Sequence, residues 1–238
     1  MIDIHKKILS LIVIFMWNEN HISRVTRSKN DARFFYNRIS RFYDFSEGIF
    51  ERKYIHMGVQ RLFVKKGDIV LEIGVGTGES VIEFAKLVGD SGKVYGVDIS
   101  ELMLDVTRMK LKKRGLLDRV EFVNKDAVSL SFKNGFFDKI FMSFTLELFD
   151  TPEIPKLLSE CFRVLKKNGR IVVVSLSKKN RNVIVRIYEW LHGIFPRMLD
   201  CRPIFVEEVL NNAEFKTISA SLVSMWGLQV EIIVGRVK

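Results

Sequence analysis

Cysteine is scarce in this sequence: its 238 residues include only Cys161 and Cys201. Two such thiols provide neither a disulfide framework nor the paired spacing of a metal site, so we expect no metal and two reduced thiols in a cytoplasmic protein. Internal repeats and low-complexity tracts are also absent. With 47% hydrophobic and 28% charged residues, a single globular domain with an insertion is expected.

The sequence also lacks a hydrophobic run long enough to predict a membrane span. Residues 8–17 are apolar, but a bilayer requires ~20 such residues. Lys6 and Lys7 precede this run as in a signal peptide, yet no small-residue cleavage site follows it. The run is an interfacial anchor, a packed helix or sequence upstream of a start at Met16. We expect a cytoplasmic protein and leave membrane association open.

Acidic residues do not balance the basic ones, and the net charge is +10. The excess lies at the ends of the chain, because residues 1–66 contain 13 Lys and Arg against 6 Asp and Glu, whereas residues 67–175 contain 16 of each. A basic flank favours contact with anionic lipid, nucleic acid or an acidic substrate, or is simply a solvated surface.

One stretch organises the chain. Residues 69–73 are apolar and β-branched, which predicts a buried strand. Three glycines follow at alternate positions, Gly74, Gly76 and Gly78. A dinucleotide fingerprint requires its third glycine at offset five, where this chain has Glu79. With Glu72 upstream, the pattern is typical of the acidic-x-Gly-x-Gly-x-Gly loop of methyltransferases that use S-adenosylmethionine (AdoMet); the alternative is a plain strand–turn–helix corner.

Strands and helices alternate after this loop. We expect further strands at residues 93–97, 120–123, 137–143 and 170–175, with helices at 101–114 and 153–166 between them and a turn at Asn168–Gly169 before the last of these strands. Such alternation predicts a doubly wound parallel sheet that binds ligands at the carboxyl ends of its strands. Two strands at 215–223 and 230–237, joined at Gly227, complete a seven-stranded, mostly parallel, Rossmann-like α/β sheet.

Three side chains near this edge suit a nucleoside. Asp98 ends the second strand, about 20 residues past the glycine loop, where a carboxylate can accept both ribose hydroxyls; as a lone residue it could instead cap the helix that Ser100 opens. Met103 either packs on an adenine face or belongs to the core. Asp126, after the third strand, could accept from the adenine amine.

Two segments flank the expected AdoMet-binding domain of residues 67–238. Residues 1–66 are expected to form a helical cover, of which 1–20 are an anchor or disordered. Its helices either cover the core or form a lid that closes Tyr36 and Tyr43 over a cofactor. Residues 177–203 are expected to form a basic amphipathic helical insertion after the fifth strand, which covers a substrate pocket, lies on a membrane surface or packs on the protein.

Taken together, these motifs resemble class I AdoMet-dependent methyltransferases, and most of all the ubiquinone/menaquinone biosynthesis (UbiE) family. The resemblance lies in residues 70–78, 96–100 with Met103 and Leu104, 126–127, 137–144 and 163–170, and in residues 36–44 of the cover. It implies AdoMet as cofactor and contacts from the following residues: Gly74, Gly76, Thr77, Asp98, Asp126, Ala127 and Ser143. We nominate five more residues for cofactor binding: Glu72, Gly78, Ile99, Met103 and Tyr43.

The chain departs from the quinone enzymes after the fourth strand, because residues 145–148 read Thr-Leu-Glu-Leu where those enzymes typically have Gly-Leu-Arg-Asn. We nominate Glu147 as the catalytic base, with His192 as the alternative. The expected acceptor is a small hydrophobic molecule of the quinone or phenol type. Phospholipid head-group methylation at a membrane surface and AdoMet binding without catalysis are the alternatives, and nucleic acid is a weaker candidate.

Overall fold

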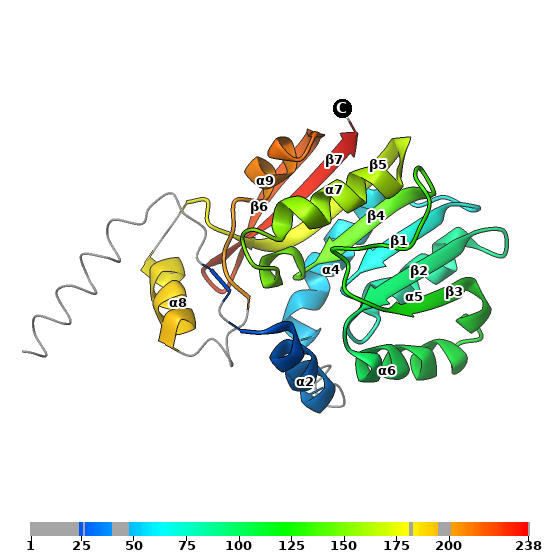
Figure 1. The fold of residues 1–238 in the computed structure, drawn as a ribbon, viewed down its shortest axis with the longest axis horizontal. Coiled ribbons are helices and arrows are strands. Elements are labelled where there is room, and N and C mark those ends of the chain that lie inside the picture. The colour runs from blue at the N-terminus through cyan, green and yellow to red at the C-terminus, as the bar shows by residue number, and fades with distance from the viewer. Residues whose placement is uncertain (1–23, 26, 40–47, 181–182, 195–200, 238) are drawn as a thin grey trace, which may run out of the picture.

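The computed structural model describes residues 24–25, 27–39, 48–180, 183–194 and 201–237. Their strands form one seven-stranded sheet, and helices cover both of its faces (Figure 1). The apolar run at residues 8–17 and the nominated cofactor residue Tyr43 lie outside the described residues.

The sheet has the strand order β3-β2-β1-β4-β5-β7-β6. Its strands are β1 (Ile69–Ile73), β2 (Lys93–Asp98), β3 (Val120–Asn124), β4 (Phe137–Ser143), β5 (Leu165–Ser177), β6 (Phe215–Met225) and β7 (Leu228–Val237). Strands β1 to β5 pair in parallel, and β7 is antiparallel to both β5 and β6. The predicted doubly wound sheet with a terminal hairpin is confirmed.

The helices are α2 (Lys29–Ile39), α4 (Gly48–Leu62), α5 (Glu79–Val88), α6 (Glu101–Lys112), α7 (Ile154–Val164), α8 (Val183–Ile194) and α9 (Val206–Asn212), with 3₁₀ turns η1 (Leu117–Arg119) and η2 (Leu146–Leu148). Buried residues of α4, α5 and α6 pack against one face of the sheet, and those of α7 and α9 pack against the other. No helix in the described ranges is long and apolar enough to cross a bilayer.

Two hydrophobic clusters account for the uniform apolar character of the central strands. Along β5, Val172 and Val174 face the α4–α6 cluster, while Ile171 and Val173 face the α7–α9 cluster. Successive side chains of a strand point to opposite faces, so a strand buried on both sides needs apolar residues throughout.

The structure corrects one boundary. The turn expected at Asn168–Gly169 lies inside β5, which begins directly after α7. The pairing of β5 with β4 shifts there, from Phe137 opposite Leu165 to Lys139 opposite Arg170. The residues that suggested a turn are therefore accommodated as an irregularity in a longer strand.

The terminal hairpin closes with the two residues Trp226 and Gly227. Both have positive φ angles, 56° and 88°, as in a type I′ turn, whose twist matches that of the paired strands. Helix α8, the helix expected within the insertion, lies beside this turn, and a Cβ atom on Gly227 would overlap the Ile184 side chain.

Candidate active site

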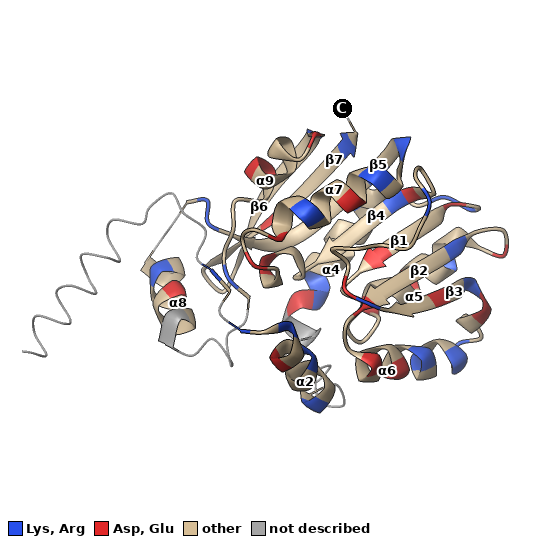
Figure 2. Ribbon diagram, viewed as in Figure 1, with Lys and Arg blue, Asp and Glu red and all other residues tan. Residues whose placement is uncertain are grey.

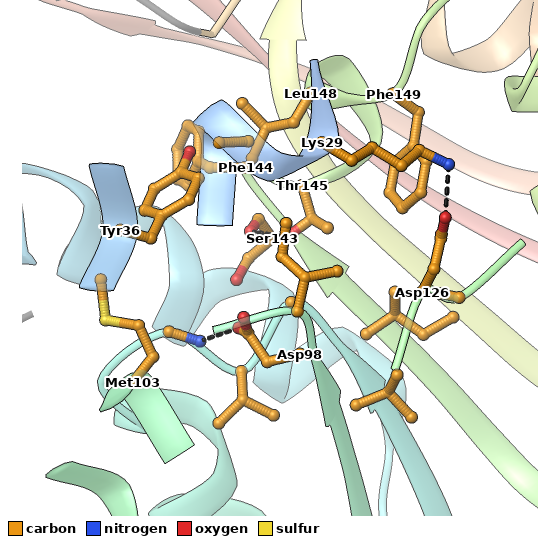
Figure 3. A pocket seen from close by; sticks show the side chains of 18 of the residues that line it. Lys29, Tyr36, Asp98, Met103, Asp126, Ser143, Phe144, Thr145, Leu148 and Phe149 are labelled. Atoms are coloured by element: carbon orange, nitrogen blue, oxygen red, sulfur yellow. Dashed lines mark hydrogen bonds and ion pairs between the residues drawn. The ribbon is translucent and has the colours of Figure 1, made fainter. Parts of the chain in front are cut away.

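A cavity opens at the carboxyl ends of β1, β2 and β4 and beneath α2 (Figure 3). Its empty volume is about 1340 Å³, counting space open to solvent. It is lined by ten of the twelve residues nominated for the cofactor: Gly74, Gly76, Thr77, Gly78, Asp98, Ile99, Met103, Asp126, Ala127 and Ser143. Parallel strands ending at one edge bring these separate motifs together, as the alternation of elements predicts.

The glycine loop passes from β1 to α5 along the floor of the cavity. Its three glycines have positive φ angles of 77°, 52° and 83°. A Cβ atom would overlap the side chain of Thr145 at Gly74 and that of Thr107 at Gly78, whereas at Gly76 it would meet no atom within 4 Å. Gly74 and Gly78 are therefore required by packing, and Gly76 keeps backbone open toward the cavity.

Asp98 provides a fixed carboxylate beside this loop. Its Oδ2 accepts a hydrogen bond from Gly76 N at 2.9 Å and its Oδ1 accepts one from Ser100 N at 2.8 Å. Burial raises the pKa of the Asp98 carboxyl to about 6, although these backbone donors oppose the shift. The carboxyl group lines the cavity, and a carboxylate is an acceptor that can bind the hydroxyls of a ribose diol.

Glu72 lies behind the loop and does not line the cavity. Its side chain is 1% exposed and accepts a hydrogen bond from Ser80 Oγ at the start of α5. Burial raises the pKa of the Glu72 carboxyl to about 8. This hydrogen bond connects β1 to the start of α5. A direct contact between Glu72 and the cofactor stays a prediction.

Helix α2 lies over the mouth of the cavity and places Lys29, Ala32 and Tyr36 in its lining. Lys29 forms an ion pair with Asp126 (Figure 3) and a second one, at 2.5 Å, with Glu153. Tyr36 lies on the same side of the cavity as Met103 in this view. The position agrees with the lid interpretation of the cover.

Upstream of α2, Arg24 forms an ion pair with Asp150, which also lines the cavity. Its guanidinium donates to both oxygens of Asp150, with Nε–Oδ1 at 2.8 Å and Nη2–Oδ2 at 2.7 Å. This pairing holds the pKa of the Asp150 carboxyl well below its usual range. Sequence reasoning missed both this pair and the Lys29 bridge, because their partners are more than 90 residues apart and no local pattern joins them.

The segment that follows β4 forms an apolar wall of the cavity, which sequence reasoning also missed. We use the name "apolar wall" for Phe144, Leu148 and Phe149 of this segment together with Ile55 of α4 and Tyr36 of α2. The only available signal was the position of residues 144–149 directly after a strand at the ligand edge.

The structure does not place the nominated base at the cavity. Glu147 does not line it, and its side chain is fully buried, with Oε1 accepting from Leu176 N at 3.1 Å. Within the three-residue turn η2, Leu148 faces the cavity while Glu147 points into the protein. His192, the alternative, is 9% exposed on α8 and is also absent from the lining.

Strand order, glycine loop and strand-ending carboxylate together define the class I methyltransferase fold. A model of the ubiE/COQ5 methyltransferase family matches residues 17–202, and the chain belongs to this family of AdoMet-dependent methyltransferases. The predicted family and cofactor are confirmed.

Two curated relatives illustrate the family. The chain is 34% identical over 146 residues to the ubiquinone/menaquinone biosynthesis C-methyltransferase UbiE of Marinomonas sp. (strain MWYL1), which covers 61% of this chain and 57% of that protein. It is 38% identical over 126 residues to UbiE of Yersinia pestis bv. Antiqua, covering 53% and 49%. The chain thus spans about half the length of the curated relatives it matches.

Solved structures share the fold. A Burkholderia thailandensis 1,6-didemethyltoxoflavin-N1-methyltransferase with bound S-adenosylhomocysteine has a TM-score of 0.68 at 16% identity, covering 91% of this chain and 93% of that one. At this identity the likeness shows the fold alone.

The residues present fit AdoMet. Gly76 leaves open space where a side chain would otherwise intrude, and the Asp98 carboxylate faces the same cavity. Ile99 and Met103 add an apolar surface that suits a purine ring. Asp126 accepts from Val128 N at 3.1 Å through Oδ1, and its other oxygen pairs with Lys29.

Proposed function

We propose that this protein transfers the methyl group of AdoMet to a small hydrophobic acceptor of the quinone or phenol type. The observation that carries the proposal is the apolar wall, which adjoins Ser143 and Thr145 in the same cavity as the glycine loop. Pockets that combine an apolar surface with a few polar groups are typical of small-molecule sites. The two UbiE relatives are named as ubiquinone/menaquinone biosynthesis C-methyltransferases, which agrees with such an acceptor.

In this proposal the chain acts mainly by positioning. AdoMet, when bound, supplies a methyl group already activated by its sulfonium. Gly76 and Asp98 hold the nucleoside, the apolar wall orients the acceptor, and α2 excludes water from above. Holding the reacting groups in register can account for a large part of the rate enhancement.

Proton removal is not assigned to Glu147, since its side chain lies outside the cavity. Asp150 lines the cavity, but Arg24 lowers the pKa of its carboxyl, which makes it a weak proton acceptor. We therefore propose that neither Glu147 nor Asp150 is the base. We also propose that the apolar wall determines which acceptor is methylated.

Transfer of radiolabel from AdoMet to a demethylated quinol, compared with transfer to phospholipid, tests the acceptor class. We expect label on the quinol carbon. Label on phospholipid head groups would establish the alternative acceptor, and S-adenosylhomocysteine binding without transfer to either substrate would favour a protein that binds AdoMet without catalysis.

A substitution in the apolar wall separates acceptor binding from cofactor binding. Leu148→Gln should raise the KM for the acceptor about tenfold, because a polar amide replaces apolar contact area, while the affinity for S-adenosylhomocysteine stays unchanged. Leu87→Gln is the matched control, because Leu87 is 42% exposed on α5 and does not line the cavity. Unchanged acceptor kinetics in Leu148→Gln would contradict the proposed role of this wall.

A further inference from the structure

Helix α8 presents its apolar side to solvent. Val183, Ile184, Ile187 and Trp190 are 70%, 46%, 51% and 53% exposed, and they recur at the spacing of one helical face. The opposite face packs on the protein: Val185 is fully buried, Tyr188 Oη donates to Cys201 O at 2.8 Å, and Glu189 pairs with Lys178 at 3.3 Å. A surface helix normally exposes polar residues on its outer face, so this exposed apolar face indicates an interaction site.

A second exposed aromatic residue extends this face. Trp226, in the hairpin turn beside α8, is 78% exposed. Contact between Ile184 and Gly227 places the helix next to the turn. We call these five residues the α8 patch: Val183, Ile184, Ile187, Trp190 and Trp226. It holds five of the eleven large hydrophobic side chains that are exposed in the described part of the chain.

Tryptophan is an unfavourable residue at position 226 of the hairpin turn. Its φ of 56° lies in the left-handed region, where type I′ turns favour Asn, Asp or Gly. An Asn-Gly turn would be the most favourable pair at these two positions. A bulky aromatic residue that is both conformationally unfavourable and exposed fits a surface role better than a folding role.

From these observations we propose that the α8 patch docks the protein on an anionic phospholipid surface. Tryptophan is favoured at membrane interfaces, because its ring is apolar and its N–H is polar. Charge agrees with this occupant, since the whole chain is +10 and Arg186 is exposed on α8. Lys178 and Arg202 are buried and Lys179 is paired with two carboxylates, so these three basic residues do not add to the charge of the patch. The two charged residues of α8 itself are the exposed Arg186 and the paired Glu189, and most of the helix is uncharged in Figure 2.

Co-sedimentation of the full chain with vesicles tests the proposal without requiring turnover, so its result is independent of the acceptor. We expect binding to vesicles of phosphatidylcholine with phosphatidylglycerol, and weaker binding to phosphatidylcholine alone or at high salt. Trp226→Asn combined with Ile187→Asp should reduce the partition coefficient about tenfold or more. Trp226→Asn retains a favourable turn, and unchanged S-adenosylhomocysteine binding would show that the variant is folded.

Met109→Asp is the matched control, because Met109 is 58% exposed on α6, away from the patch. In a Trp17→Phe background, a blue shift of tryptophan emission on adding vesicles would come from the two patch tryptophans and support the proposal. It would be overturned by a wild type that does not bind anionic vesicles, or by a double variant that binds them as the wild type does. Loss of a dimer in the variant, with vesicle binding intact, would identify a second copy as the occupant instead.

Discussion

The affinity for the cofactor product S-adenosylhomocysteine should fall in acid because of Asp98. The carboxyl of Asp98 has a pKa raised to about 6 by burial, and it accepts hydrogen bonds from Gly76 N and Ser100 N. If this carboxylate accepts the two ribose hydroxyls, the bound ligand favours its charged form and lowers this pKa. Linkage then requires that binding weaken as the free protein becomes protonated.

The size of the effect follows from the pKa. Below about pH 6 the charged fraction of Asp98 in the free protein falls roughly tenfold per pH unit, so affinity should drop about tenfold, or ~1.4 kcal/mol, between pH 7 and pH 5. Asp98→Asn removes the charge-assisted hydrogen bonds, which are worth ~1.5–3 kcal/mol, and should weaken binding about 10- to 100-fold at pH 7. The variant should also lose the acid dependence between pH 7 and pH 5.

Isothermal titration with S-adenosylhomocysteine at several pH values measures both effects. Glu79→Gln is a useful control, since it neutralises another carboxylate of the same cavity, one that pairs with Arg52 at 2.9 Å. Equal affinities of the wild type at about pH 5 and pH 8 would refute the assignment of Asp98 to the ribose, as would an acid dependence that persists in Asp98→Asn.

Three further substitutions test the loop and the cover. Glu72→Gln should raise the free energy of unfolding relative to the wild type, because the folded state resists ionisation of this buried carboxyl. The gain should grow as the pH rises from 4.5 to about 8, where it reaches ~4 kcal/mol, and denaturant unfolding across that range measures it. Gly74→Ala should lower the melting temperature more than Gly76→Ala, because both positions have a positive φ but only the Cβ at Gly74 would overlap a side chain, that of Thr145. Gly76→Ala should lose cofactor affinity more than stability, and similar melting temperatures of the two variants would contradict this division. Lys29→Met should speed hydrogen exchange in α2 by removing both of its ion pairs, and Lys29→Arg should restore protection.

The fold could be predicted because each part of the sequence supports the same architecture. The strand at residues 69–73 was recognised from an apolar run followed by glycines, and the structure gives it the same bounds. The hairpin was recognised from Gly227 between two β-branched segments. Boundaries were less certain where tertiary contacts decide them, as at Asn168 and Gly169, which continue a strand rather than end one.

The nucleoside part of the site could be predicted for a similar reason. Asp98, Asp126 and Ser143 follow three neighbouring parallel strands, so their place at one edge is set by topology alone. The cover could not be predicted in the same way. The contact of Lys29 with Asp126 depends on where a helix far away in the sequence comes to lie, and the direction of a side chain in a single 3₁₀ turn depends on what packs beneath it.

That packing explains the conformation of residues 145–148, the segment that differs from the Gly-Leu-Arg-Asn typical of quinone methyltransferases. Glu147 accepts from the backbone of Leu176, and the fully buried Arg202 donates to Phe149 O at 2.5 Å. Burial lowers the pKa of Arg202 to about 10, and the nearby charge of Glu147 opposes that shift. These two buried charges therefore hold the turn from inside the protein, and Leu148 and Phe149 are left to face the cavity. Acceptor recognition at this wall would then rest on apolar contact rather than on a polar pair, which is why a substitution at Leu148 tests the proposed function more directly than one at Glu147.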